Sequence, residues 1–369
     1  RAMFALAEKY DNTINLCIGE PGFATPQNII DQGCWAWNHG YTKYVSNPGL
    51  MVLREAIADK LNRENGFHVG PENVIVTFGA NQALFSAFQV TINPGDEILV
   101  PNPCFANYFG YIALAQGVAV PVPTYEKDHF HVKAEVLEQY ITDKTRLLII
   151  NSPCNPTGSV TPKEDLMAIA ELAKKHDLIV VSDEPYEHIL FDGNEHCSIA
   201  TLPGMFERTI TANGFSKTYA MTGWRIGYGV ADPETIKAMT LVLASTTSNV
   251  TAAVQIAALE ALKGSQQCVA DMNAEYWRRR DILVKGLNET KGISCITPEG
   301  AFYAFANIKE LGMTSKEVAI KLLDEVQVVT TPGDAFGPAG EGYLRFSFAA
   351  SEEDIREALN RIQRCLGTK

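Results

Sequence analysis

Residues 209–217 have the sequence TITANGFSK, in which a strand-forming run leads directly into a polar turn. The first four residues predict a buried strand, and Ser216 and Lys217 follow just beyond its carboxyl end. Open α/β sheets bind their ligands at this edge, where the carboxyl ends of parallel strands meet. The stretch therefore predicts an α/β fold with a ligand site beside Lys217.

Further strands of the same sheet are predicted by short apolar runs at residues 74–77, 97–100, 147–150 and 178–181. Several of these runs are continuously apolar rather than alternating, which suits strands that are covered on both faces. Amphipathic stretches predict helices between the strands, at residues 82–90, 162–175 and 233–244. This alternation of strand and helix predicts a mostly parallel sheet.

The chain has 369 residues and a mass of 40.4 kDa, which favours two domains over one small core. The sequence pattern changes near residue 265. Beyond it we expect a charged helix at 271–290, strand-like pieces at 300–306, 326–331 and 342–348, and a closing helix at 351–366. This second part is interpreted as a smaller α+β domain.

Composition excludes some classes of partner. The balance of 31 basic and 43 acidic residues gives a formal charge of -12, which argues against a general nucleic-acid or anionic-membrane surface. The 8 cysteines are scattered singly without a Cys-x-x-Cys pair, which favours a reducing, cytoplasmic location. No apolar run is long enough to span a bilayer. A local anion site and small-molecule partners remain compatible with this composition.

The residues around Lys217 favour a reactive amine beside an anion. Lys217 stands between Ser216 and Arg225 in a setting of apolar residues and glycines, where burial would lower the pKa of the amine. Ser216 and Arg225 are suited to holding a phosphate dianion. A lysine that forms a Schiff base with a phosphorylated aldehyde needs both features.

Residues 213–228, NGFSKTYAMTGWRIGY, resemble the cofactor-lysine motif of the class I and II aminotransferases, the fold-type I family of pyridoxal 5′-phosphate (PLP) enzymes. Ordered matches run from Ile18-Gly19-Glu20-Pro21-Gly22 to Tyr343-Leu344-Arg345-Phe346-Ser347, nearly the whole chain. The resemblance implies PLP as the aldehyde and a homodimer as the assembly. It also implies a large PLP-binding domain at 26–265 and a discontinuous small domain made of 1–25 and 266–369.

A phosphate cup is expected around the anion. Gly79, Ala80 and Asn81 lie between a predicted strand and helix, so free backbone N–H groups would face an anion there. That signal is weak alone, because strand-Gly-helix turns are common, but Ser216 and Arg225 would complete the cup. The resemblance adds Tyr44, which would reach the phosphate from the second subunit. The alternative for Tyr44 is an aromatic side chain packed in a turn.

Acidic and polar residues at two strand ends are assigned to the cofactor ring. Asp183 follows an apolar strand, so its buried charge needs a cationic partner, which the resemblance identifies as the protonated pyridine nitrogen. The alternative is a helix N-cap. The resemblance implies that Tyr186 and Asn155 bond the phenolic oxygen of the cofactor, that Asn155 also faces the substrate, and that Phe105 stacks on the ring.

Arg345 is the candidate for substrate binding. Its apolar neighbours favour a buried guanidinium that binds a carboxylate in a bidentate way. The resemblance assigns it the α-carboxylate of the substrate, with the backbone of Ile18 and Gly19 closing over the same group. The alternative is a structural ion pair.

Two other patterns are not interpreted as sites. Gly223, Gly227 and Gly229 lack dinucleotide-binding spacing, so they are interpreted as permitting close packing. His129 and His131 have no third ligand nearby in sequence and are interpreted as a solvated strand face. No metal is expected.

The resemblance implies a two-stage transamination, in which Lys217 acts as general base and acid between the substrate Cα and the cofactor C4′ carbon. It is strongest to the bacterial I-gamma subgroup, with its aspartate, aromatic and acyl-diaminopimelate aminotransferases. Aspartate-specific members often have a lysine where Asn81 stands. Because a neutral asparagine cannot form an ion pair with the side-chain carboxylate of aspartate, the resemblance favours aromatic or other mid-sized amino donors. Glutamate and 2-oxoglutarate are the second pair by analogy.

Two rival functions stay open. A PLP-dependent C–S β-lyase would have the same fold and the same lysine. The effector domain of a transcription regulator would need a basic helix-turn-helix segment before the domain, and the acidic chain argues against it.

Overall fold

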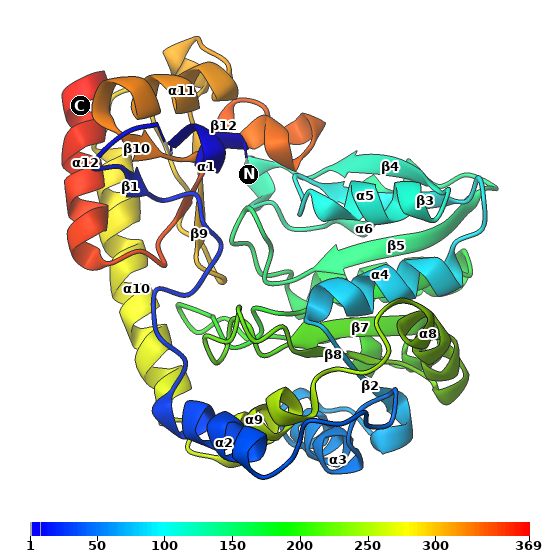
Figure 1. Cartoon of the computed structure of the whole chain (residues 1–369). Helices are drawn as coiled ribbons and strands as arrows, with labels where there is room; N and C mark the ends of the chain where they lie inside the picture. Colours follow the sequence, from blue (N-terminus) through cyan, green and yellow to red (C-terminus); the bar gives the residue numbers. More distant parts are fainter. Residues whose placement is uncertain (1, 8) are drawn as a thin grey trace.

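A seven-stranded sheet forms the centre of the larger part of the molecule in the computed structural model, which describes residues 2–7 and 9–369 (Figure 1). The strand order is β2-β8-β7-β6-β5-β3-β4. Strand β8 runs antiparallel to both neighbours, and the other strands are parallel to one another, as expected for a mostly parallel sheet. The strands are β2 (Val74–Thr77), β3 (Glu97–Asn102), β4 (Val118–Pro123), β5 (Thr145–Asn151), β6 (Ile179–Asp183), β7 (Thr209–Gly214) and β8 (Gly227–Val230).

Both faces of this sheet are buried, as the continuous apolar runs predicted. Side chains alternate along a strand, so Leu147 and Ile149 of β5 pack on one face and Leu148 and Ile150 on the other. Helices α4, α5 and α8 cover the first face, and α7 covers the second. The helices of this part are α2 (Gln27–Asn38), α3 (Met51–Lys60), α4 (Ala80–Thr91), α5 (Asn107–Leu114), α6 (Ala134–Glu138), α7 (Lys163–Lys175), α8 (Pro233–Thr246) and α9 (Ala252–Lys263).

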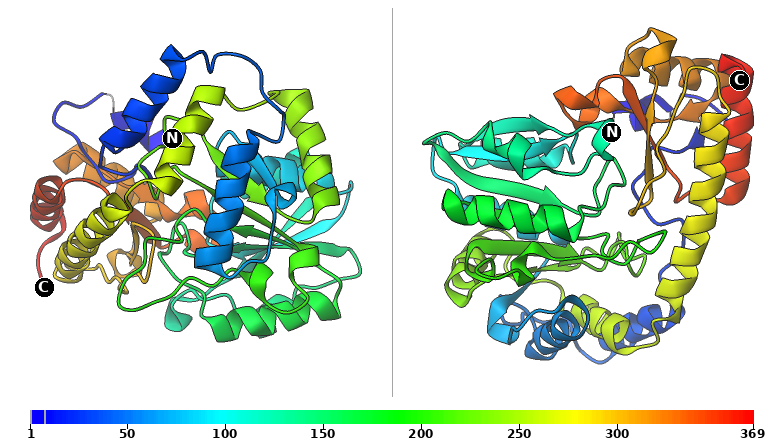
Figure 2. Two further views of the ribbon diagram at one scale, coloured as in Figure 1. Left: turned by 90° about the horizontal axis from the view of Figure 1, so that it is seen from below. Right: turned by 180° about the vertical axis from the view of Figure 1, so that it is seen from behind.

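Helix α10 (Gln267–Asn288) runs along one side of the molecule and carries the chain into a second layer (Figures 1 and 2). That layer holds a three-stranded antiparallel sheet of order β11-β12-β9 and a short parallel pair of β1 with β10. Its elements are α1 (Ala2–Ala7), β1 (Ile14–Asn15), β9 (Tyr303–Asn307), α11 (Ser315–Val326), β10 (Val328–Val329), β11 (Thr331–Pro332), β12 (Tyr343–Ser347) and α12 (Glu352–Leu366).

The N-terminal residues pack into this second layer. Ile14 and Leu16 belong to the same hydrophobic cluster as Val328 and Phe346, and β1 pairs with β10 more than 300 residues away in sequence. This packing favours the discontinuous small domain, although the boundaries near residues 25 and 265 remain predictions. None of the described helices has the length and apolar character needed to cross a membrane.

Some elements differ from the sequence prediction. The strand-like piece at 326–331 is divided, because Val326 ends α11 and Gln327 has a left-handed backbone before β10 begins. Strand β8 and helix α11 were not expected. Strand β6 extends to Asp183, so this residue ends the strand rather than following it, and residues 184–188 form a turn instead of a helix. The N-cap alternative for Asp183 is therefore wrong.

Candidate active site

A cavity of about 390 Å³ lies at the carboxyl ends of the central strands, within the size range of small-molecule sites. All of the predicted site residues except Tyr44 line it, namely Ile18, Gly19, Gly79, Ala80, Asn81, Phe105, Asn155, Asp183, Tyr186, Ser216, Lys217, Arg225 and Arg345. The strand register explains much of this convergence, because Asn151 of β5 pairs with Asp183 of β6, which in turn pairs with Ala212 of β7. Residues that follow these strands therefore meet at one edge.

The amine of Lys217 is held in the cavity by the backbone of the N-terminal segment. Lys217 Nζ donates a hydrogen bond of 2.6 Å to the carbonyl oxygen of Gly19. Burial lowers the pKa of Lys217 to about 8, opposed by Glu20 and assisted by the positive charges of Arg345 and Arg225. A substantial fraction of this amine is therefore neutral, and nucleophilic, near pH 8.

Asp183 is a buried carboxylate with one oxygen free of any protein partner in the described part of the chain. Its side chain is 4% exposed, Oδ2 accepts a 2.6 Å hydrogen bond from the Tyr108 hydroxyl, and Oδ1 has no hydrogen-bond partner. Burial raises the pKa of Asp183 to about 7, while the Tyr108 bond acts in the opposite direction. A buried carboxylate with a free oxygen is unfavourable unless a ligand supplies a donor or a positive charge.

Tyr186 is held by a second tyrosine that sequence reasoning did not identify. The hydroxyl groups of Tyr186 and Tyr303 lie 2.8 Å apart, and their rings meet edge to face. Tyr303 also lies against Gly19, where an added Cβ would come within 2.3 Å of the Tyr303 hydroxyl. Burial raises the pKa of both phenols, so both remain protonated at neutral pH. Because one hydroxyl donates to the other, one O–H of the pair is left as a hydrogen-bond donor at this wall of the cavity.

Arg345 is a buried guanidinium without an acidic partner among the described residues. It donates to Asn155 Oδ1 at 2.8 Å and to the carbonyl oxygen of Cys17, and its Nε has no partner. Its guanidinium lies over the ring of Tyr303, 4.4 Å from the centroid. The alternative of a structural ion pair is wrong for the described chain, because no carboxylate there lies within ion-pairing distance of Arg345.

The residues expected to form a phosphate cup, Gly79, Ala80, Asn81, Ser216 and Arg225, all line the cavity, where a tight backbone turn precedes α4. Gly79 has a φ of +78° directly before α4, a conformation that suits glycine, and an added Cβ would lie 3.0 Å from Arg225 Nη2. Gly227 packs against the same turn, where a Cβ would lie 2.6 Å from the backbone nitrogen of Ala80. Close packing is thus confirmed at Gly227, whereas Gly223 has open space around its Cα.

Arg225 itself donates only to the carbonyl oxygens of Thr222 and Phe78, at 2.8 and 3.3 Å. In the described part of the chain no carboxylate pairs with it. Its positive charge therefore faces the cavity beside the N-terminus of α4, where the helix dipole also favours an anion.

Tyr44 does not reach the cavity of its own chain. Its side chain is 89% exposed, so the alternative of a packed aromatic in a turn is wrong for the single chain. The histidine prediction is also corrected: His131 lies beyond a short 3₁₀ turn, not on a strand, and its Nε2 lies 2.8 Å from Glu299 Oε2. The described residues contain no cluster of three potential metal ligands.

Sequence reasoning missed several residues that line or support the cavity. Tyr303, Glu20 and Thr222 line it, and Thr222 donates a hydrogen bond to Glu20. Tyr108 lies behind Asp183. Glu20 lies within the motif at residues 18–22, which is a local signal, whereas the tyrosines carry none because their partners are distant in sequence.

Comparison with known proteins gives a consistent result. A family model described as aminotransferase class I and II matches residues 11–362. The chain is 47% identical to an aspartate aminotransferase of Pyrococcus abyssi, over 100% of this chain and 95% of the relative. It is 45% identical to aromatic-amino-acid aminotransferase 2 of Thermococcus litoralis, with the same coverage.

Among solved structures, the aromatic aminotransferase from Pyrococcus horikoshii OT3 is similar with a TM-score of 0.94 and 46% identity, over 98% of each chain. These relatives are named for two different amino donors, although their likeness to this chain is nearly equal. The comparisons therefore agree on the type of reaction and leave the donor to be decided by the cavity.

Proposed function

The chain belongs to the class I and II aminotransferases, and from this premise we propose that it moves an amino group between an L-amino acid and a 2-keto acid at the cavity beside Lys217. One observation carries the proposal. A single cavity brings together the amine of Lys217, the free carboxylate oxygen of Asp183 and the guanidinium of Arg345. These are a nucleophile, a partner for a cation and a partner for a carboxylate, which amino-group transfer between two acids requires.

We propose PLP as the cofactor, because the lining residues fit its parts. Asp183 Oδ1 is a buried acceptor in need of a positive donor, which a protonated pyridine nitrogen would supply. The turn at Gly79, together with Ser216 and Arg225, suits a phosphate, and Phe105 offers an aromatic face. When bound, PLP supplies an aldehyde for the amine and an electron sink for carbanion chemistry at the substrate Cα.

The protein's own groups would bind the substrate and move its protons. Arg345 and Asn155 are placed to hold the α-carboxylate, which would orient the Cα–H bond for removal. Lys217 Nζ would accept the Cα proton and return one later, a role that suits an amine whose pKa is about 8. The Tyr186 hydroxyl would donate a hydrogen bond within the cavity.

We propose that donors with uncharged, mid-sized or aromatic side chains are preferred over aspartate. The basic side chains among the described residues that line the cavity are Lys217, Arg225 and Arg345, and each already has a role. Asn81 is neutral, and Glu20 adds a negative charge to the lining. A second substrate carboxylate therefore has no free cation within this chain.

We also propose a homodimer in which Tyr44 completes the partner's cavity. The exposed Tyr44 side chain, which contributes nothing to its own cavity, supports this assembly. Subunit mixing tests it. Chains with Tyr44→Ala and chains with Lys217→Ala should each be impaired alone, while mixed dimers regain activity because one cavity then has both residues. If mixing restores nothing although heterodimers form, Tyr44 does not act across the interface.

The deciding experiment is an absorbance spectrum of the purified protein with PLP, titrated with a panel of amino acids. A visible band that fades with phenylalanine or tyrosine and returns with a keto acid would establish amino-group transfer and the donor class. The Lys217→Ala variant is the control, and it should form no such band and lose turnover. If Lys217→Ala kept most of its turnover, the assignment of Lys217 would be wrong. A band that persists while cystathionine yields pyruvate would instead establish the C–S β-lyase.

A further inference from the structure

A buried carboxylate outside the cavity joins the two turns that carry the proposed catalytic residues. Glu187 follows Tyr186 directly, and it does not line the cavity. Its side chain is 5% exposed and pairs with the ammonium of Lys60, which is 4% exposed. Two buried charges of opposite sign need well-aligned hydrogen bonds to offset their loss of hydration. The remaining hydrogen bonds of this carboxylate therefore indicate what it holds in place.

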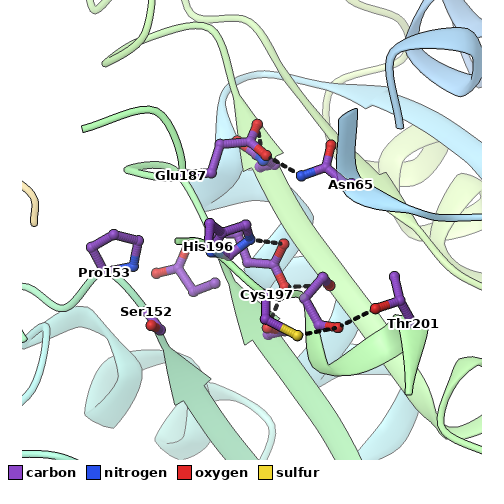
Figure 3. Close-up of polar contacts among 12 residues, drawn as sticks. Asn65, Ser152, Pro153, Glu187, His196, Cys197 and Thr201 are labelled. Carbon is purple, nitrogen blue, oxygen red and sulfur yellow. Dashed lines mark hydrogen bonds and ion pairs between the residues drawn. The ribbon is translucent and has the colours of Figure 1, made fainter. Parts of the chain in front are cut away.

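Two asparagines from different segments donate to the two oxygens of Glu187. Asn213 Nδ2 donates to Oε1 at 2.8 Å, and Asn65 Nδ2 donates to Oε2 at 2.6 Å. Figure 3 shows Asn65 and Glu187 pointing toward each other from separate segments. Asn213 lies in β7, four residues before Lys217, whereas Asn65 lies at the end of a π-helical segment, Leu61–Asn65, that continues α3. Only one of these bonds therefore acts on the lysine segment.

Lys60 at the end of α3 and Asn65 at the end of the π-helical segment reach the same carboxylate. Lys60 and Asn65 are five residues apart, the spacing of a π-helical hydrogen bond, and Lys60 Nζ also donates to Asn65 Oδ1 at 2.8 Å. Glu187 Oε1 thus accepts from Lys60 and Asn213 and Oε2 accepts from Asn65, and the ion pair with Lys60 keeps the pKa of Glu187 low despite its burial. Glu187 is consequently a permanent anion with fixed neighbours.

The other side of the same turn is fixed independently. Glu184 accepts hydrogen bonds of 2.7 Å from Ser182 and Ser198. Its Oε2 also lies 3.0 Å from Nε2 of His196, which Figure 3 labels. The turn that follows Asp183 and carries Tyr186 is therefore anchored to the 196–198 segment. With that anchor in place, the bond between Glu187 and Asn213 fixes the end of β7 relative to the turn.

We propose that Glu187 is a positioning residue for the proposed amino-transfer reaction: through Asn213 it fixes the segment leading to Ser216 and Lys217 against the turn that bears Asp183 and Tyr186. This inference rests on the proposed function for its catalytic consequence. Its structural part concerns only the chain's own residues, because the pKa of the Lys217 amine, which depends on its surroundings, can be measured without cofactor.

The test compares two variants that each remove one amide donor from the same carboxylate. Asn213→Ala breaks the bond to the lysine segment, and Asn65→Ala is the matched control because Asn65 lies on the other segment. In the cofactor-free protein, the rate of Lys217 acetylation is measured by peptide mass spectrometry at a series of pH values. The midpoint of this pH dependence gives the pKa of the Lys217 amine. This midpoint should lie near 8 in the unaltered chain. Asn213→Ala should raise it by about half a unit or more as the amine becomes better hydrated.

Asn65→Ala should leave the acetylation midpoint unchanged. In the PLP-loaded enzyme, Asn213→Ala should lower kcat about tenfold with little change in KM, because the amine is misplaced rather than absent. Equal shifts in the two folded variants, or no shift in either, would overturn the proposal. If wild-type chain with PLP transfers no amino groups, the proposed function fails, but the acetylation result still decides the positioning role.

A second pair of variants guards against poor folding of Asn213→Ala, which also loses the hydrogen bond from Gly214 N to Asn213 Oδ1. Lys60→Met with Glu187→Gln removes both charges and keeps an acceptor for Asn213, whereas Lys60→Met with Glu187→Leu removes the acceptor as well. Neither leaves an unpaired buried charge. The first double variant should label Lys217 like wild type, and the second should show the raised midpoint. Identical midpoints in the two double variants would refute the positioning role.

Discussion

Replacing Asp183 by asparagine should make the cofactor-free protein more stable at neutral pH. The buried carboxylate has a pKa raised to about 7 from an ordinary value of 3.8, because burial disfavours its charged form. Folding at pH 7.5 therefore forces an anion into a site with a free oxygen at Oδ1. Asparagine can keep the hydrogen bond from Tyr108 without that charge.

The size of this effect on the free energy of unfolding follows from the difference in the pKa of Asp183 between the folded and unfolded states. The shift from 3.8 to about 7 is about 3 units, and at about 1.36 kcal/mol per unit it corresponds to about 4 kcal/mol. Below about pH 4 the carboxyl is protonated in both the folded and the unfolded state, so its burial causes no loss of folding stability through ionisation. Between about pH 4 and 7 only the folded state holds the proton, so stability falls as pH rises, and above about pH 7 the loss is complete.

Urea unfolding of the cofactor-free wild type and Asp183→Asn at pH 5 and pH 7.5 measures this directly. The advantage of Asp183→Asn should grow from about 2 kcal/mol at pH 5 to about 4 kcal/mol at pH 7.5. Asp177→Asn is the control, because Asp177 is 94% exposed and its replacement should change little. With PLP added, the order should reverse, since only the wild type offers an anion to the ring nitrogen. An advantage that is absent at pH 7.5, or that does not grow with pH, would refute the reasoning.

Three further substitutions test individual contacts. Arg345→Gln should raise KM for amino and keto substrates about 100-fold, because a charge-assisted bond to the α-carboxylate is lost; steady-state kinetics showing an unchanged KM would exclude this role. Asn81→Lys should raise kcat/KM for aspartate relative to phenylalanine about tenfold by supplying a cation, and an unchanged ratio would contradict the view that a missing cation limits aspartate. Tyr303→Phe should lower kcat about tenfold while KM changes little, because the Tyr186 hydroxyl loses its partner but the ring under Arg345 remains; a rise in KM alone would assign Tyr303 to binding instead.

The strands that build the site could be predicted from the sequence because their runs are continuously apolar. Such runs indicate strands buried on both faces, and the residues just beyond parallel strands must share an edge. Strand β8 gave no such signal, since half of its four residues are glycines, and its place between β2 and β7 depends on pairing with both. The division of 326–331 was likewise hidden, because the left-handed Gln327 breaks an otherwise strand-like run.

The hydrogen-bond partners of the site residues could not be predicted from local sequence, because they lie far away along the chain. Asp183 was predicted from its place after an apolar strand and Tyr186 from the family resemblance, but their partners Tyr108 and Tyr303 lie 75 and 117 residues away. His131 was misread for the same reason, because Glu299 is 168 residues distant. Local sequence predicts which side chains reach the edge of a sheet, whereas tertiary packing selects the groups that orient them. The orienting residues are therefore where the structure adds most to the sequence. Glu187 lies outside the cavity lining, so substitutions in its hydrogen-bond network separate the positioning of Lys217 from the chemistry of the cavity.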